Sequence, residues 1–148
     1  MIKMELVWKF LVIAVIFAVI SQGIHTIAAF LEMKYYLMPE YFSVWSKLMM
    51  PGPGPPPLSF TLLSVLVGTV TAVIYSFAYL LVMKWIPGSS SLKKGANFGL
   101  MLFFVGVLPG YLALMLLINL PLQLIFYWMV EGLIINVLAG ILIVRILG

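Results

Sequence analysis

The sequence predicts an all-α, polytopic membrane protein: one transmembrane domain, residues 1–148, with four helices in a bundle and a short interfacial helix in the first outer loop. Two observations predict this fold class. Of the 148 residues, 65% are hydrophobic and only 8% are charged, whereas about a quarter of the residues in a soluble domain are charged. The few charges also leave long uncharged stretches, each sufficient for a helix of about 20 residues across the hydrocarbon core.

The same composition excludes several classes of function. Eight Lys and Arg residues are too few for a nucleic-acid-binding surface, so we expect membrane lipids as partners and no nucleic acid. The absence of cysteine excludes disulfides, thiolate metal sites and cysteine nucleophiles. No GxxxxGK[ST], HExxH or GxSxG motif occurs, so we assign no catalytic residue, metal ligand or cofactor.

The first span is predicted at about residues 6–31, because no charge occurs between Lys9 and Glu32. Its apolar stretch exceeds that of a signal peptide and has no A-x-A cleavage site, so we expect it to be retained. The second span, about residues 58–83, follows a run of prolines and carries no charge.

The third and fourth spans share an uncharged stretch that only Glu131 interrupts. That stretch is too long for one helix. Asn119 and Pro121 supply the break, since a proline disfavours helix before it and is accepted in the first turn of the next helix. We therefore predict spans at about residues 96–118 and 121–146.

The two longer connections differ in composition. Residues 84–95 end in GSSSLKKG, which predicts a flexible loop without chemistry. In residues 32–57 an interfacial helix is predicted from one apolar face, formed by Tyr41, Val44, Trp45, Leu48 and Met49. The following PGPGPPP favours extended polyproline backbone, which we interpret as a stiff strap rather than a recognition motif.

The basic residues orient the bundle, because cytoplasmic loops are rich in Lys and Arg. Six of the eight fall on one side: Lys3, Lys9, Lys84, Lys93, Lys94 and Arg145. The other side holds Lys34 and Lys47, which Glu32 and Glu40 offset. We therefore expect a multi-pass protein of the cell membrane with both termini in the cytoplasm.

Small residues four apart predict where helices pack closely. These are Ser64, Gly68, Ala72 and Ser76 in the second span, Gly106 and Gly110 in the third, and Gly132 and Gly140 in the fourth, where Asn136 lies midway between the two glycines. Their partner helix is either in the same chain or in another subunit. Pro109, between Gly106 and Gly110, removes one backbone hydrogen bond and predicts a distortion of the third span.

The candidate functional residues are the polar ones at membrane depth, since an ionisable side chain there is costly and usually faces inward. They are Glu131, Gln22, His25 and Asn136. At ~1.5 Å of rise per residue, Glu131 lies ~15 Å below the outer surface, Gln22 ~13 Å and His25 ~9 Å. We expect Glu131 to meet the first span through Gln22, whose depth matches, or through His25.

Several short motifs carry a resemblance. MPEY precedes the outer loop, Lys-Gly precedes a span containing VLPGY, and Glu-Gly lies in the last span. In these features the chain resembles uncharacterised small prokaryotic four-span membrane proteins. The resemblance implies no activity.

Three functions are compatible with this sequence. We favour a non-catalytic accessory or scaffolding component that packs with itself or within a larger membrane complex. The alternative is a small oligomeric transporter or channel whose pathway passes Glu131, and a third hypothesis is an intramembrane enzyme using His25 and Glu131. A water-filled cavity that reaches Glu131 favours transport, whereas a filled, dry core favours the scaffold.

Overall fold

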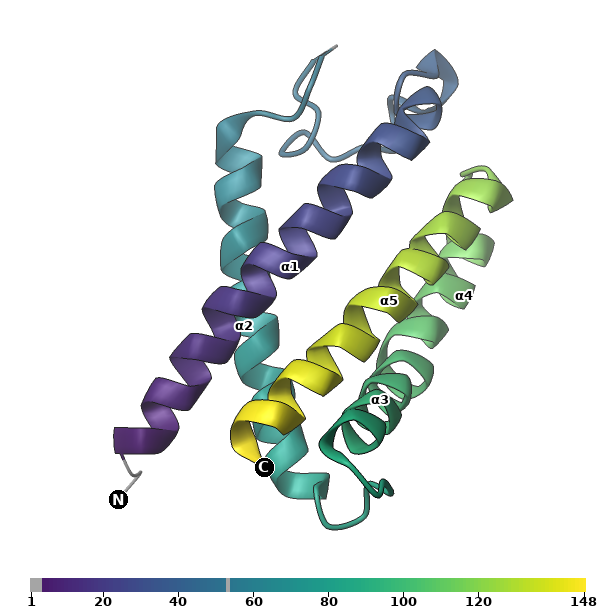
Figure 1. The fold of residues 1–148 in the computed structure, drawn as a ribbon. Helices are drawn as coiled ribbons and strands as arrows, with labels where there is room; N and C mark the ends of the chain where they lie inside the picture. The colour runs from purple at the N-terminus through teal and green to yellow at the C-terminus, as the bar shows by residue number, and fades with distance from the viewer. Residues whose placement is uncertain (1–3, 53) are drawn as a thin grey trace.

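The computed structural model describes residues 4–52 and 54–148. Lys3, which was counted for the orientation, and Pro53, which belongs to the predicted strap, lie outside the described residues. Within these ranges all regular structure is helical, and four helices are long and apolar enough to cross a membrane. The predicted class, a bundle of four membrane helices, is confirmed (Figure 1).

Four crossings make up the fold. The first, second and fourth are single helices: α1 Met4–Tyr36, α2 Leu58–Val82 and α5 Leu122–Leu147. The third is continuous from Ser91 to Leu117 and consists of α3 Ser91–Met101, the π-helical segment η2 Leu102–Val107 and α4 Leu108–Leu117.

The crossings form two pairs that contact each other. Helix α1 packs on α2, and the third crossing packs on α5. Helix α5 also contacts α1 and, less extensively, α2. Figure 1 shows the start of α1 and the end of α5 at the same end of the bundle, which we call the terminal end. Residues 37–52, 54–57 and 118–121 lie at the opposite end, which we call the strap end.

The buried core lies toward the terminal end. Its members come from the N-terminal half of α1, the C-terminal halves of α2 and α5, and α3: Ile13, Ala14, Phe17, Ala72, Tyr79, Phe98, Ile135, Ala139, Ile143 and Val144. Packing between side chains stabilises helix contacts in a membrane, and most of that packing is in this core. The half of the bundle near the strap end is less completely filled, as described below.

Helix α3 crosses α5 at very short range through glycines. A Cβ atom on Gly95 would lie 2.5 Å from Ile141 Cα, and one on Gly99 would lie 2.5 Å from Val137 Cα. Gly140 of α5, predicted at an interface, lies against Gly95 and Gly99 in the same way. Only glycine fits where two backbones approach this closely.

The small residues of α2 face α1. A Cβ atom on Gly68 would lie 3.5 Å from Ser21 Oγ, and Ala72 and Ser76 are buried. Ser64 continues this row, and both Ser64 and Gly68 line a cavity. The row therefore has its partner helix within the same chain.

Gly106 and Gly110 contact no other helix within the part of the chain that the structure describes. A Cβ atom on either residue would meet no neighbouring atom within 4 Å among the described residues. The reason is the position of the third crossing at the edge of the bundle, where it contacts α5 with one face while Phe104, Val105 and other residues stay exposed. A contact of this glycine pair with another subunit, the alternative that the sequence leaves open, stays a prediction.

The distortion predicted at Pro109 takes the form of π-helix in the residues before it. The backbone N–H of Leu108 donates to Phe103 O, five residues back. A proline cannot donate to the preceding turn, and a π-helical segment is one way in which a helix adjusts its hydrogen bonds locally. The segment η2 thus lies one turn before the proline.

Two helices are longer than predicted. Helix α1 continues to Tyr36, because contacts of Glu32 and Tyr36 with α5 hold the last turn against the bundle. Helix α3 begins at Ser91 within the expected flexible loop. Ser90 Oγ accepts a hydrogen bond from Lys93 N over 3.3 Å, which caps the first turn.

The interfacial helix is not confirmed. Only η1, Pro39–Tyr41, is helical in this loop, as a single 3₁₀ turn, and residues 42–50 form turns and bends. Ser46 Oγ accepts a hydrogen bond from Met49 N at 3.2 Å, a local bond that competes with a continuous helix. The Trp45 ring packs against the rings of Tyr36 and Trp128. These contacts, rather than the apolar face of a helix, hold the loop against the bundle.

Candidate functional site

His25 of α1 and Glu131 of α5 form the polar contact at the centre of the candidate site. His25 Nδ1 lies 2.6 Å from Glu131 Oε1, a hydrogen bond that becomes an ion pair when both groups are charged. The Glu131 side chain is 11% exposed, whereas the His25 side chain is 56% exposed. The carboxyl group therefore faces into the bundle and meets the first span, as its depth predicted.

The partner is His25 rather than the better-matched Gln22 because α1 ends later than predicted. With α1 ending at Tyr36, His25 lies ~16 Å from that end and Gln22 ~21 Å. Glu131 lies ~13 Å from the start of α5 at Leu122. No hydrogen bond joins Gln22 to Glu131 within the described ranges 4–52 and 54–148, although Gln22 lies one turn from His25.

A second polar contact joins the same two helices closer to the strap end. The Glu32 residue is only 3% exposed, and its Oε2 accepts hydrogen bonds from Tyr36 Oη at 3.0 Å and Trp128 Nε1 at 3.1 Å. Trp128 lies three residues before Glu131 on α5, and Glu32 lies seven after His25 on α1. The two contacts therefore follow one another along a single α1–α5 interface.

Sequence reasoning placed Glu32 in the outer loop and missed this second contact. The available signal was the spacing: residues 25 and 32 share one side of a helix, and so do residues 128 and 131. Tyr36 and Trp45 pack on one another, with ring centroids 5.1 Å apart, and the Tyr36 hydroxyl donates a hydrogen bond to the Glu32 carboxyl group.

A cavity of about 450 Å³ lies beside the His25–Glu131 pair. It is lined by residues from all four crossings: Phe17, Ser21, Gln22, His25, Phe60, Leu63, Ser64, Val67, Gly68, Thr71, Tyr75, Val107, Tyr111, Gly132, Ile135 and Asn136. Glu131 is not in the lining, so His25 is the member of the pair that the cavity reaches. Among these residues the hydroxyl, amide and imidazole groups give the cavity a mixed polar and apolar wall.

Asn136 lines the same cavity but belongs to a different set of contacts. It is 4% exposed, and its Nδ2 donates to Gly132 O at 2.7 Å. Its Oδ1 is buried with no hydrogen-bond partner among the described residues. Gly132, predicted at an interface, lies under Tyr111: a Cβ atom there would be 3.1 Å from Tyr111 Oη.

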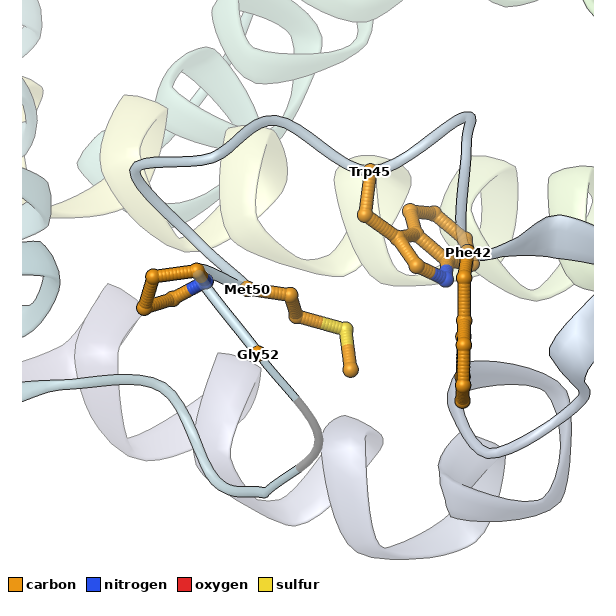
Figure 2. Close-up of a pocket in the computed structure, with 5 residues that line it drawn as sticks. Phe42, Trp45, Met50 and Gly52 are labelled. Carbon is orange, nitrogen blue, oxygen red and sulfur yellow. The ribbon is translucent and has the colours of Figure 1, made fainter.

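A smaller cavity of about 210 Å³ lies in the strap-end loop. Figure 2 shows the Met50 side chain extending into the space between Phe42 and Trp45. Trp45 Nε1 is buried without a partner among the described residues. Because this cavity is formed by one loop and by apolar side chains, it offers no ionisable group for chemistry.

The site brings together two of the four predicted residues by direct contact, Glu131 and His25, and the other two through the shared cavity. Its ligand set is poor for a metal ion. Within the part of the chain that the structure describes, no group of three His, Cys, Asp or Glu residues lies close enough to hold one. The arrangement can accept or donate a proton and can form hydrogen bonds to a molecule in the cavity.

No family model, curated protein or solved structure matches the chain. Its function therefore has to be inferred from its own side chains.

Proposed function

We propose that this protein is a small transporter or channel of the cell membrane whose pathway includes the cavity and the His25–Glu131 pair. The observation that supports the proposal is the cavity, with its mixed polar and apolar wall, that reaches His25. Ionisable residues that lie within the membrane and beside a cavity mark ion or substrate pathways.

The scaffold hypothesis accounts less well for the same features. A scaffold gains from a filled core, because packing holds membrane helices together. Near the terminal end the core is filled in this way, but near the strap end the helices leave about 450 Å³. A hydrogen-bonded pair beside that volume, with one member more than half exposed, favours a pathway over a purely structural network.

The proposal includes an orientation and an assembly. By the positive-inside rule we expect both termini, and therefore the terminal end, to lie in the cytoplasm. The strap end, toward which the cavity extends as far as Phe60, then faces outward. Four helices enclose little space, so we place the rest of the pathway at an interface between copies of the chain.

The proposal is tested with proton flux into liposomes that contain the purified protein and a pH-sensitive dye. A potassium diffusion potential drives proton uptake. We expect wild-type protein to acidify the lumen faster than empty liposomes, and Glu131→Gln to reduce that difference at least about tenfold, because the amide cannot exchange the proton. Circular dichroism checks that the variant is folded.

Glu5→Gln is the matched control, since Glu5 is an exposed carboxyl group paired with Lys9 on the surface of α1. It should conduct like the wild type. Wild-type flux equal to that of empty liposomes would overturn the proposal in favour of the scaffold. Full flux in Glu131→Gln would show that the pathway avoids this residue.

A further inference from the structure

We propose that the cavity binds a lipid-soluble molecule whose polar head carries an O–H or N–H group, and that this group donates a hydrogen bond to His25 Nε2. The inference deepens the proposed function by naming the ligand class of the same cavity. It rests on the imidazole geometry, the chemistry of the lining and the side on which the cavity is open.

Glu131 determines which imidazole nitrogen is available. It occupies Nδ1, and within residues 4–52 and 54–148 no group is hydrogen-bonded to Nε2. When an ionised carboxylate accepts from Nδ1–H of a neutral imidazole, the other nitrogen carries a lone pair. A carboxylate that bonds one nitrogen in this way fixes both the tautomer and the orientation of the ring. Glu131 is thus a positioning residue, and Nε2 of His25 is the acceptor for a ligand.

The lining excludes an anionic head group. Among the described residues around the cavity there is no Lys or Arg, so a phosphate or carboxylate would have no cation to bind. Aromatic and branched side chains such as Phe17, Phe60 and Val67 form much of the wall. This combination of apolar wall and few polar groups is typical of sites for small amphiphilic molecules.

The size and the open side fit a ligand that arrives from the bilayer. A cavity of about 150 Å³ holds a benzene ring, so about 450 Å³ accommodates a ring with a short alkyl chain. Helix α1 contacts both α2 and α5, which closes one side of the cavity, whereas α2 and α4 contribute to the wall without comparable packing against each other. A lipid-soluble molecule can therefore approach between α2 and α4.

Binding of matched phenyl compounds to the protein in nanodiscs tests the inference. The probes are 4-hexylphenol and 4-hexylaniline, which carry an O–H and an N–H donor, and 4-hexylanisole, the methyl ether without a donor. Empty nanodiscs correct for partition into lipid. We expect the phenol, the aniline or both to bind about tenfold more tightly than the anisole, since one hydrogen bond distinguishes them. The two donor compounds distinguish an alcohol-type from an amine-type ligand.

Two variants assign this preference to the imidazole. His25→Phe keeps a ring but removes the acceptor, so the preference for the donor compounds should fall to about onefold. Thr26→Val is the control, because Thr26 Oγ1 bonds its own helix at Gln22 O and Thr26 does not line the cavity. In Glu131→Gln the side-chain amide can donate a hydrogen bond to Nδ1 of His25, which leaves the imidazole proton on Nε2. Nε2 is then a donor, so the preference for the donor compounds should fall or reverse in favour of the anisole.

Equal binding of all three probes to the wild type, or an unchanged preference in His25→Phe, would overturn the inference. A wild-type preference for the anisole would overturn the assigned tautomer and with it the ligand class. Because binding is measured without flux, donor-selective binding in a protein that conducts no protons would refute the proposed function alone. Proton flux without donor selectivity would refute only this inference.

Discussion

Gly99 and Gly106 belong to the same helical crossing, yet their surroundings are opposite. Gly99 faces α5 at backbone contact, whereas Gly106 faces open space. Sequence spacing singled out Gly106 and gave no weight to Gly99. Whether a glycine in a membrane helix marks a close helix contact therefore depends on which residues lie opposite it.

We predict that Gly99→Ala destabilises the fold by about 1–3 kcal/mol, because the added methyl group would overlap backbone atoms of Asn136 and Val137 that have no room to move. The free energy of unfolding is measured by circular dichroism in mixed micelles of increasing denaturing-detergent content. Gly106→Ala is the control, and it should be neutral or stabilising by up to about 1 kcal/mol, since alanine favours helix. Equal effects of the two changes would contradict the close α3–α5 crossing.

At the candidate site, depth along the helices was sufficient to predict that Glu131 meets the first span. It was insufficient to choose the partner, because the end of α1 was predicted five residues early, at residue 31 rather than Tyr36. The error came from Glu32. A charge normally ends a span, but here the carboxyl group is buried and bonded by Tyr36 and Trp128. Such a contact between distant parts of the chain has no local sequence signal.

At the scale of elements, the best predicted helices are those that prolines delimit. Helix α2 follows Pro57 and α5 follows Pro121, and both begin within one residue of the prediction. The interfacial helix was predicted from a periodic apolar face, but Trp45 is bound by aromatic rings of α1 and α5. Periodicity predicts where a helix would bury its face, and tertiary contacts decide whether that helix forms.

The α1–α2 contact gives the second prediction of stability. We expect Gly68→Leu to destabilise the protein more than Leu66→Ala does, because Gly68 faces α1 near Ser21 whereas Leu66 is exposed. The comparison uses the midpoint of thermal unfolding in detergent. Comparable midpoints for the two variants would argue against close packing of this row on α1.

At the scale of the whole molecule, four crossings bring both ends of the chain to one side (Figure 1). Lys9, Lys84 and Arg145 lie toward this terminal end, as do Lys93 and Lys94 in the first turn of α3. The charge distribution and the fold therefore agree on which segments share a side. Which side of the membrane that is follows from the positive-inside rule alone.

We predict that reporter proteins fused after residue 148 and inserted between residues 88 and 90 both report the cytoplasm. A reporter placed in residues 42–50 should report the opposite side, because that segment lies at the strap end. Paired reporters that are active only in the cytoplasm or only outside it make the measurement. An external signal from either of the first two positions would reverse the proposed orientation.

The unequal filling of the bundle has a mechanical consequence. Near the terminal end the helices share a buried core, and glycines bring α3 and α5 into backbone contact. Near the strap end the α1–α5 interface holds the two polar contacts, and a cavity lies beside them. Local opening needs least free energy where few apolar contacts must be broken. We therefore expect the bundle to open more readily beside the cavity, next to the His25–Glu131 pair, than across the glycine contact of α3 with α5.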